Sequence, residues 1–256
     1  MDNSELIWEL QKAIVDIYEQ ENLISLSGFE DNYIVNNRNI LTWFVDITGR
    51  NPNNFEAQFD YFKNLDDIKF CCDELLYFTA HLYLYRSYIN NPVKDGELYY
   101  GKMHYPNNQN IESKRYSMFA DITCQNAYNF WDRIGDLLAS FFPGLLTPFN
   151  ITFIKVIEAI PIENQHSENY AWLKKFKETD YSELNKKRKN TVHYITSDTE
   201  FKYRHLERII DKESMQALQS ERENLADFYK KHLSLTITGF EKTLLFLDEI
   251  SPLSST

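Results

Sequence analysis

Apolar residues recur at helical spacing along most of the chain. The clearest case lies in residues 55–90, where we predict one long helix. On the second half of this segment the apolar side chains are spaced alternately by four and three residues: Cys71, Leu75, Phe78, Leu82, Tyr85 and Ile89. Such a stripe is typical of a helix with one face buried in a core. The same periodicity predicts further helices over residues 4–21, 115–142, 148–160, 167–177 and 212–248.

Residues that interrupt helices are scarce. Between Pro161 and Pro252 the chain has no proline and a single glycine, Gly239, which favours long helices. Hydrophobic residues make up 43% of the 256 residues and aromatic residues 15%, enough for a substantial core. We therefore predict an all-α bundle of long antiparallel helices. We expect one domain over residues 1–256, with residues 1–54 as an N-terminal appendage.

Two polar segments separate the predicted helices. Residues 92–113 contain two glycines, two prolines and a run of Asn and Gln, and we expect a long loop there. A Thr-Ser-Asp-Thr run follows Tyr194 and predicts the end of the helix before it.

The charge of the chain limits where nucleic acid can bind. A formal net charge of -11 argues against binding over the whole surface, because such binding scales with the number of phosphates neutralised. Residues 173–189 are the exception, with seven Lys and Arg residues against three Asp and Glu residues. Any RNA site is therefore expected to be local and to lie in this region.

Several classes of enzyme lack their sequence signals. Cys71 and Cys72 are adjacent and Cys124 is remote, so the cysteines have no metal-ligand spacing. The chain also has no Gly-rich phosphate loop, no Gly-x-Ser-x-Gly and no His-Glu-x-x-His. We expect neither a metal nor a cofactor. Without a signal-peptide pattern or an apolar run of transmembrane length, we expect a cytoplasmic protein that is not bound to a membrane.

Residues 180–194 form the most informative stretch. Asp180, followed three residues later by Glu183, predicts a helix N-cap. On a period of 3.6 residues one face carries Tyr181, Leu184, Arg188, Thr191, Val192 and Ile195. Arg188 therefore interrupts an apolar stripe. Because burying an unpaired guanidinium is costly, we expect a carboxylate, a carbonyl or an anionic ligand to face it.

Arg188 and His193 together suit metal-independent cleavage of a phosphodiester. His193 would move a proton to or from the ribose 2′-hydroxyl or the leaving oxygen, and Arg188 would bind the phosphate as its charge grows. Residues five apart on a straight helix point about 140° away from each other and differ by roughly 7.5 Å along the axis. The two side chains can converge only if the helix ends near His193 or if a symmetric second copy supplies one of them.

The spacing Arg188-x4-His193, with the polar Asn190 between them, resembles the HEPN superfamily (higher eukaryotes and prokaryotes nucleotide-binding). The late position of this helix, after a long aromatic-rich helix, strengthens the resemblance. It implies a helical bundle that forms a homodimer, in which two such motifs face one another. By carry-over, Arg188 and His193 are the catalytic pair and Asn190 is an assisting polar residue.

The resemblance also implies a metal-independent endoribonuclease, often part of a toxin–antitoxin or phage-defence system, with an antitoxin or neighbouring protein as partner. RNA would bind the basic run Lys186, Lys187 and Lys189, and Tyr194 would stack on a base. Other members of the superfamily have no activity and serve in binding or assembly.

Two further interpretations stay open. In the first, the protein is a non-enzymatic interaction or nucleotide-binding module, and Arg188 is structural, bridging an interior acid such as Asp132 or Asp136. The second concerns His81, which lies inside the aromatic stripe of the long helix. A histidine in such a place is more often a satisfied core residue than a catalytic one.

Overall fold

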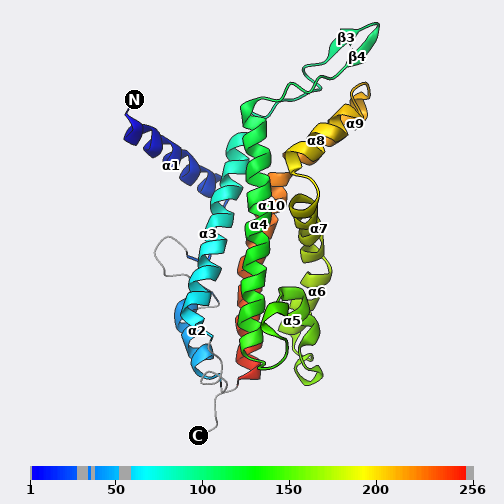
Figure 1. The fold of residues 1–256 in the computed structure, drawn as a ribbon. Coiled ribbons are helices and arrows are strands. Elements are labelled where there is room, and N and C mark those ends of the chain that lie inside the picture. Colours follow the sequence, from blue (N-terminus) through cyan, green and yellow to red (C-terminus); the bar gives the residue numbers. More distant parts are fainter. Residues whose placement is uncertain (1, 28–33, 36–37, 52–58, 252–256) are drawn as a thin grey trace. The chain divides into compact units, whose positions relative to one another are not determined.

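The computed structural model describes residues 2–27, 34–35, 38–51 and 59–251, and these are predominantly helical. The all-α prediction is confirmed. The longest elements are α3 (Tyr61–Arg86), α4 (Ile111–Ser140) and α10 (Leu225–Ile250) (Figure 1). The chain divides into two compact units: unit 1 holds residues 1–23, 75–125 and 186–231, and unit 2 holds residues 24–74, 126–185 and 232–256. Each of the long helices contributes one part to each unit, and the single-domain expectation stays a prediction.

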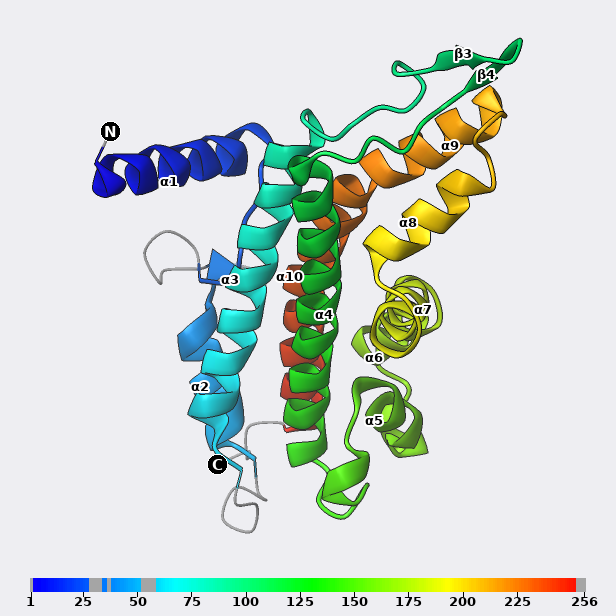
Figure 2. The ribbon, with the colours of Figure 1, turned by 45° about the horizontal axis from the view of Figure 1, so that its top comes forward.

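Unit 1 combines parts of the long helices with short elements. These are α1 (Asn3–Gln20), the hairpin of β3 (Glu97–Tyr99) and β4 (Lys102–His104), α8 (Ser197–Leu206) and α9 (Lys212–Glu223). Within this unit α3 and α4 lie side by side in both ribbon views (Figures 1 and 2). The Tyr116 hydroxyl on α4 donates to the Arg222 carbonyl at 3.0 Å, and the Tyr83 hydroxyl on α3 donates to Asp227 at 2.7 Å. Hydrogen bonds from both helices therefore reach the chain around the start of α10.

Unit 2 has an aromatic core. Its shorter elements are β1 (Ile34–Val35), β2 (Arg38–Asn39), α2 (Ile40–Gly49), the 3-10 turns η1 (Pro148–Asn150) and η2 (Ile162–Asn164), α5 (Phe153–Ala159) and α6 (Glu168–Glu178). Trp131 on α4 is fully buried, and its ring centre lies 4.9 Å from that of Phe153 and 4.1 Å from that of Phe176. Apolar residues of α4 at helical spacing around Trp131 are buried in this unit as well: Ala127, Ile134, Leu138 and Phe141.

Some predicted boundaries differ from the structure. The predicted start of the long helix at residue 55 lies outside the described residues, and α3 begins at Tyr61. The expected loop 92–113 contains the β3–β4 hairpin and the start of α4, because a Tyr-Tyr-Gly-Lys turn allows two short strands to pair. The expected helix 212–248 is divided at Asn224 into α9 and α10. The helix α8 was not predicted, since its apolar spacing is weak.

His81 lies in the core of unit 1, as its aromatic surroundings indicated. Its ring centre lies 4.5 Å from that of Phe119 on α4, and its Nδ1 is 2.8 Å from the Tyr77 carbonyl one turn earlier. Burial lowers the pKa of His81, because removal from water disfavours the charged imidazolium. His81 is therefore a packed, uncharged core residue.

Replacement of Gly239 by alanine is expected to destabilise the protein. An alanine Cβ at this position of α10 would lie 2.1 Å from the Trp131 ring, so the core would have to shift. Overpacking of this kind costs about 1–3 kcal/mol, more than the gain of about 1 kcal/mol in helix propensity. Urea unfolding would measure the change. The control Gly49→Ala, where a Cβ meets nothing within 4 Å, should not destabilise; equal stability of the two variants would contradict the packing argument.

The stability of the protein is expected to fall as the pH is lowered through about 6.5. Burial lowers the pKa of both His81 and His205 below the ordinary value of 6.5, so the unfolded chain binds protons that the folded chain does not. The loss is at most about 1.4 kcal/mol per histidine and pH unit. Urea unfolding at about pH 7.5 and 5.5 would detect it. His81→Gln should reduce the difference, and an undiminished difference in this variant would contradict the contribution of His81.

Candidate functional site

The predicted site lies on α7 (Asp180–His193), which passes from unit 2 into unit 1. In unit 2, Tyr181 and Leu184 are fully buried, as the apolar stripe predicted. The predicted N-cap at Asp180 is wrong by one position, because the Glu183 amide donates to the Thr179 carbonyl and Asp180 already lies inside the helix. Residues 186–194, which carry the candidate catalytic and RNA-binding side chains, belong to unit 1.

The helix α7 ends at His193, as the Thr-Ser-Asp-Thr run predicted. The backbone amides of Tyr194 and Ile195 both donate to the Asn190 carbonyl at 3.0 Å, which closes the last turn. Thr196 then caps α8, its side chain accepting from the Thr199 amide. The α7–α8 connection is therefore short and hydrogen-bonded on both sides.

Asp121 on α4 holds this connection from the inside of unit 1. Its carboxylate accepts from the backbone amide of Ser197 at 3.3 Å and also from the Ser197 hydroxyl. The side chain of Thr191, in the last turn of α7, hydrogen-bonds the same carboxylate. Burial raises the pKa of Asp121, and these hydrogen bonds act in the opposite direction by favouring the charged form. One half-buried carboxylate thus binds the end of α7 and the start of α8.

His193 and Tyr194 are displayed at this end of the helix. Both side chains are exposed, Tyr194 by 82%, and their ring centres are 6.5 Å apart. Asn190, one turn earlier, is exposed as well. An acid–base group (His193), an aromatic ring (Tyr194) and an amide (Asn190) are therefore exposed to solvent at the end of α7.

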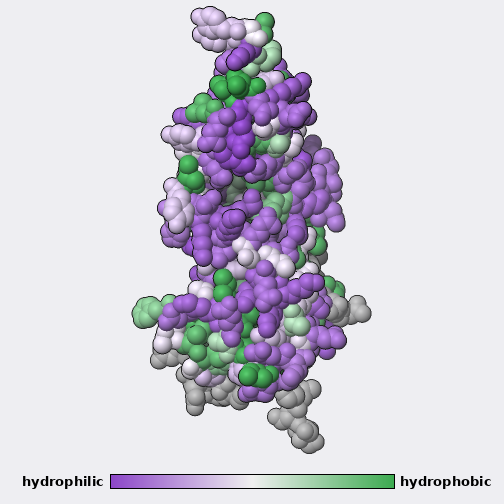
Figure 3. Space-filling model, turned by 90° about the vertical axis from the view of Figure 1, so that its right-hand side faces the viewer, coloured by the Kyte–Doolittle hydropathy of each residue, from purple (hydrophilic) through white to green (hydrophobic). Residues whose placement is uncertain are grey.

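Arg188 and the lysines divide between the surface and the interior. Arg188 is half-buried. Burial raises the pKa of Cys124 on α4, and the positive charge of Arg188 acts to lower it. The Lys187 ammonium lies 5.0 Å from the centre of the Phe228 ring on α10, a cation–π contact, and its place in the expected RNA-binding set stays a prediction. Lys186 and Lys189 are exposed. The face that carries α7 is turned to the viewer in Figure 3 and is largely hydrophilic.

A single copy of the chain does not bring Arg188 and His193 together. The helix is α-helical through both residues, and they therefore point in different directions, Arg188 half-buried and His193 in solvent. Val192, expected on the apolar face, is 50% exposed, which corrects that prediction. The apolar stripe of α7 ends after Leu184 because the second half of the helix lies at the surface of unit 1.

Sequence reasoning missed Asp121 and Ser197. A signal for Asp121 was present, since it precedes the buried Cys124 by three residues and so shares a side of the helix with the apolar stripe. An acid at such a place needs hydrogen-bond donors, but the sequence does not say which segment supplies them. Its partner Ser197 is distant in the sequence, and only the fold brings the two together.

Other chemistries find no support in the described part of the chain. Burial raises the pKa of Cys124 to about 11, so its thiol is not a nucleophile at neutral pH, and Cys71 and Cys72 are buried too. Among the described residues, no group of His, Cys, Asp and Glu has the arrangement of a metal site. No helix within these segments combines the length and hydropathy that crossing a bilayer requires.

The long helices α3, α4 and α10 define an all-helical protein. The profile of one family, described as HEPN_Cthe2314-like HEPN, matches residues 59–248, and the chain belongs to this family. Neither the curated proteins nor the solved structures gave a match. The matched range begins after residue 58, and the expectation that residues 1–54 form an N-terminal appendage stays a prediction.

Replacement of Asp121 by alanine is expected to loosen the end of α7. The variant loses the acceptor for Ser197 and Thr191, and hydrogen bonds to a charged group are worth about 1.5–3 kcal/mol each. Hydrogen exchange should show faster exchange of the amides of residues 194–199, with slow exchange retained in α3. Asp95→Ala, which removes an exposed carboxylate from the same unit, is the control. Unchanged exchange in Asp121→Ala would show that the connection is held by other contacts.

Proposed function

We propose that this HEPN protein is a metal-independent endoribonuclease whose active site forms around the end of α7. The observation that carries the proposal is the exposed His193 on a helix end that Asp121 holds in place. An acid–base group must meet its substrate in solvent and yet keep a fixed position, and this histidine satisfies both requirements. The neighbouring Tyr194 and Lys189 supply a stacking surface and a charge for a single strand.

The proposed chemistry needs only side chains. His193 accepts the proton of a ribose 2′-hydroxyl, and the 2′-oxygen forms a bond to phosphorus while the bond to the 5′-oxygen breaks. The protonated His193 passes this proton to the 5′-oxygen, and the products are a 2′,3′-cyclic phosphate and a 5′-hydroxyl. Arg188 binds the non-bridging oxygens as their charge grows, and Asn190 assists by hydrogen bonding. Lys186 and Lys189 contact flanking phosphates.

The proposed active site takes residues from two copies of the chain. Because Arg188 and His193 diverge on one helix, the arginine of one protomer would act with the histidine of its partner. The exposure of Val192 and Tyr194 at the same end supports this arrangement, since a second copy would cover apolar surface there. We infer that the homodimer is the active form.

The biological setting follows from the same chemistry. An RNA-cleaving protein needs control inside a cell, and HEPN endoribonucleases often belong to toxin–antitoxin or phage-defence systems. We propose such a setting here, in the cytoplasm, with an antitoxin or neighbouring protein as the controlling partner.

RNA cleavage in the presence of EDTA is expected, with cyclic phosphate ends on the products. His193→Ala should lower the rate by at least about 100-fold and Arg188→Ala by about 100- to 1,000-fold. Because the proposed site is shared, a mixture of the two variants that has been unfolded and refolded together should regain part of the activity. The mixed dimer contains one site with both residues intact. Product ends and rates can be followed on labelled single-stranded RNA.

Exposed His166 offers the matched control, and His166→Ala should cleave like the unaltered protein. Activity that each variant retains in full would exclude the proposed pair. Two inactive variants that do not complement each other would place both residues in one protomer. If the folded dimer cleaves no RNA and Arg188→Ala lowers stability by about 3 kcal/mol, Arg188 is structural and the protein is a binding or interaction module.

A further inference from the structure

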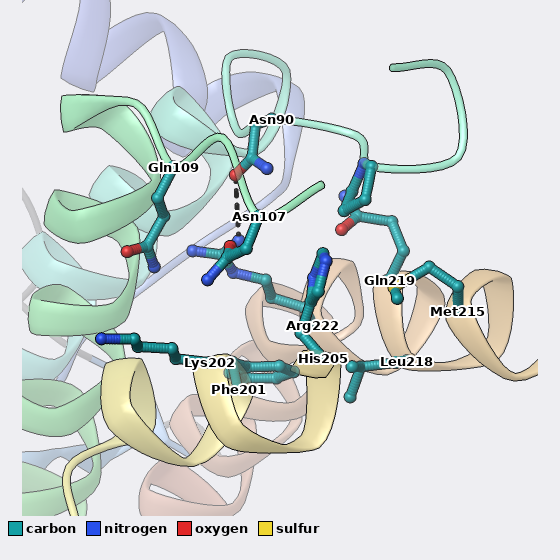
Figure 4. A pocket seen from close by; sticks show the side chains of 11 residues that line it. Asn90, Asn107, Gln109, Phe201, Lys202, His205, Met215, Leu218, Gln219 and Arg222 are labelled. Carbon is teal, nitrogen blue, oxygen red and sulfur yellow. Dashed lines mark hydrogen bonds between the residues drawn. The ribbon is translucent and has the colours of Figure 1, made fainter. Parts of the chain in front are cut away.

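A second polar site lies in unit 1, away from the residues assigned to RNA cleavage. It is a cavity of about 20 Å³ between α8, α9 and the chain before α4, room for one or two oxygen-sized atoms. Figure 4 shows the side chains that line it, among them Asn90, Gln109, Lys202, His205 and Arg222. Every one of these can donate a hydrogen bond, and none is an acid.

Arg222 on α9 is the central residue of this cavity. Its side chain is 95% buried, since only 5% of its surface is exposed. Its terminal nitrogens donate to the Ser113 carbonyl at 2.8 Å and to Asn90 Oδ1 at 3.4 Å, the contact drawn in Figure 4, and the Phe201 ring centre lies 5.5 Å away. All of these partners are neutral. These contacts fix the position of the Arg222 guanidinium, but none of them supplies a negative charge.

The charge of Arg222 has no carboxylate partner in the described segments. Asp198 contributes at a distance, but its carboxylate accepts from the Gln109 amide at 2.5 Å and forms no ion pair with Arg222. Burial lowers the pKa of Arg222, although the charge of Asp198 acts in the opposite direction. A buried guanidinium in this state costs several kcal/mol, so the fold keeps an unfavourable interaction that an anion would relieve.

Two buried donors at the cavity have no acceptor among the described residues. They are Nε of Arg222 and Nδ2 of Asn90. The two side chains contact each other through Arg222 Nη1 and Asn90 Oδ1, and both line the cavity. His205 stands beside them with Nε2 2.7 Å from the Tyr105 carbonyl, and the exposed Lys202 lies at the mouth. Two unsatisfied donors next to a buried cation form the pattern of an anion site.

We propose that this pocket binds a small oxyanion, a phosphate or carboxylate group. One oxygen of the group accepts hydrogen bonds from Arg222 Nε and Asn90 Nδ2, and the rest of the group lies at the mouth near Lys202. The size of the cavity sets this arrangement, because it admits one or two oxygens and not a whole sugar or base. The proposal does not depend on RNA cleavage or on any residue of α7.

Thermal unfolding with added anions at constant ionic strength tests the proposal. Inorganic phosphate at ten times its dissociation constant is expected to raise the melting temperature by about 3–6 °C. Acetate would show whether any oxyanion suffices, and adenosine monophosphate whether a phosphate on a larger molecule is accepted. Stabilisation by chloride equal to that by phosphate and acetate would overturn the oxyanion assignment, and no stabilisation by phosphate, acetate or adenosine monophosphate would overturn the site.

The decisive variant is Asn90→Asp. It keeps the oxygen that accepts from Arg222 and Ser113, and it adds the negative charge that the guanidinium lacks. The variant should therefore melt higher than the unaltered protein without phosphate and gain less than about 1 °C from phosphate. Asn108→Asp, the same charge change at an exposed position of the same segment, should respond to phosphate like the unaltered protein. An equal response of Asn90→Asp would refute the proposed contacts.

Lys202→Ala provides a test that leaves the buried residues intact. Since Lys202 is exposed, its removal should not disturb the fold, and it should raise the dissociation constant for phosphate roughly two- to fivefold. Titration calorimetry would measure this change. An unaltered dissociation constant would place the bound anion away from the mouth described here.

Discussion

The hydrogen bonds that Asp121 accepts from Ser197 and Thr191 determine how unit 1 presents its candidate active site. The end of α7 and the start of α8 are joined by only a few residues, and a helix end frays unless something outside the helix binds it. Asp121 supplies that contact from a neighbouring long helix, which is itself packed into the core. The exposed side chains at the α7–α8 connection are therefore held in fixed positions by the core, although they face solvent.

The cations of this acidic protein fall into distinct classes, and their burial decides what each one can do. Lys187 is engaged with the Phe228 ring, and Arg222 is enclosed by carbonyl, hydroxyl and amide groups. These contacts restrict where the two side chains can reach, but they leave both charges in place. The exposed Lys186 and Lys189 are freer to meet a phosphate, and they lie close to His193 along the helix. Attraction of RNA would therefore be weak overall and concentrated at one place, as a net charge of -11 requires.

The helices could be predicted from the sequence because their information is local. The stripe from Cys71 to Ile89 and the buried face around Trp131 follow from spacing alone. The interruption at Asn224 and the short helix α8 were missed, since there the boundaries depend on caps and tertiary contacts and not on periodicity. The exposure of Val192 was missed for a related reason, because a helical stripe does not reveal where a helix leaves the core. Asp121 and Ser197 are separated by 76 residues, so their contact is a property of the fold.

The geometry of α7 limits any mechanism that uses both Arg188 and His193. A straight helix keeps residues five positions apart on different sides, and α7 remains helical through His193, so only fraying of the last turn could turn His193 toward Arg188 within one copy. Fraying of the last turn would also break the hydrogen bonds that hold His193 in place. A twofold axis near the helix end solves the problem without distortion, because each histidine then faces the arginine of the other protomer. On this argument the catalytic pair and the dimer are one hypothesis, and a monomer of this chain would be inactive even with every side chain intact.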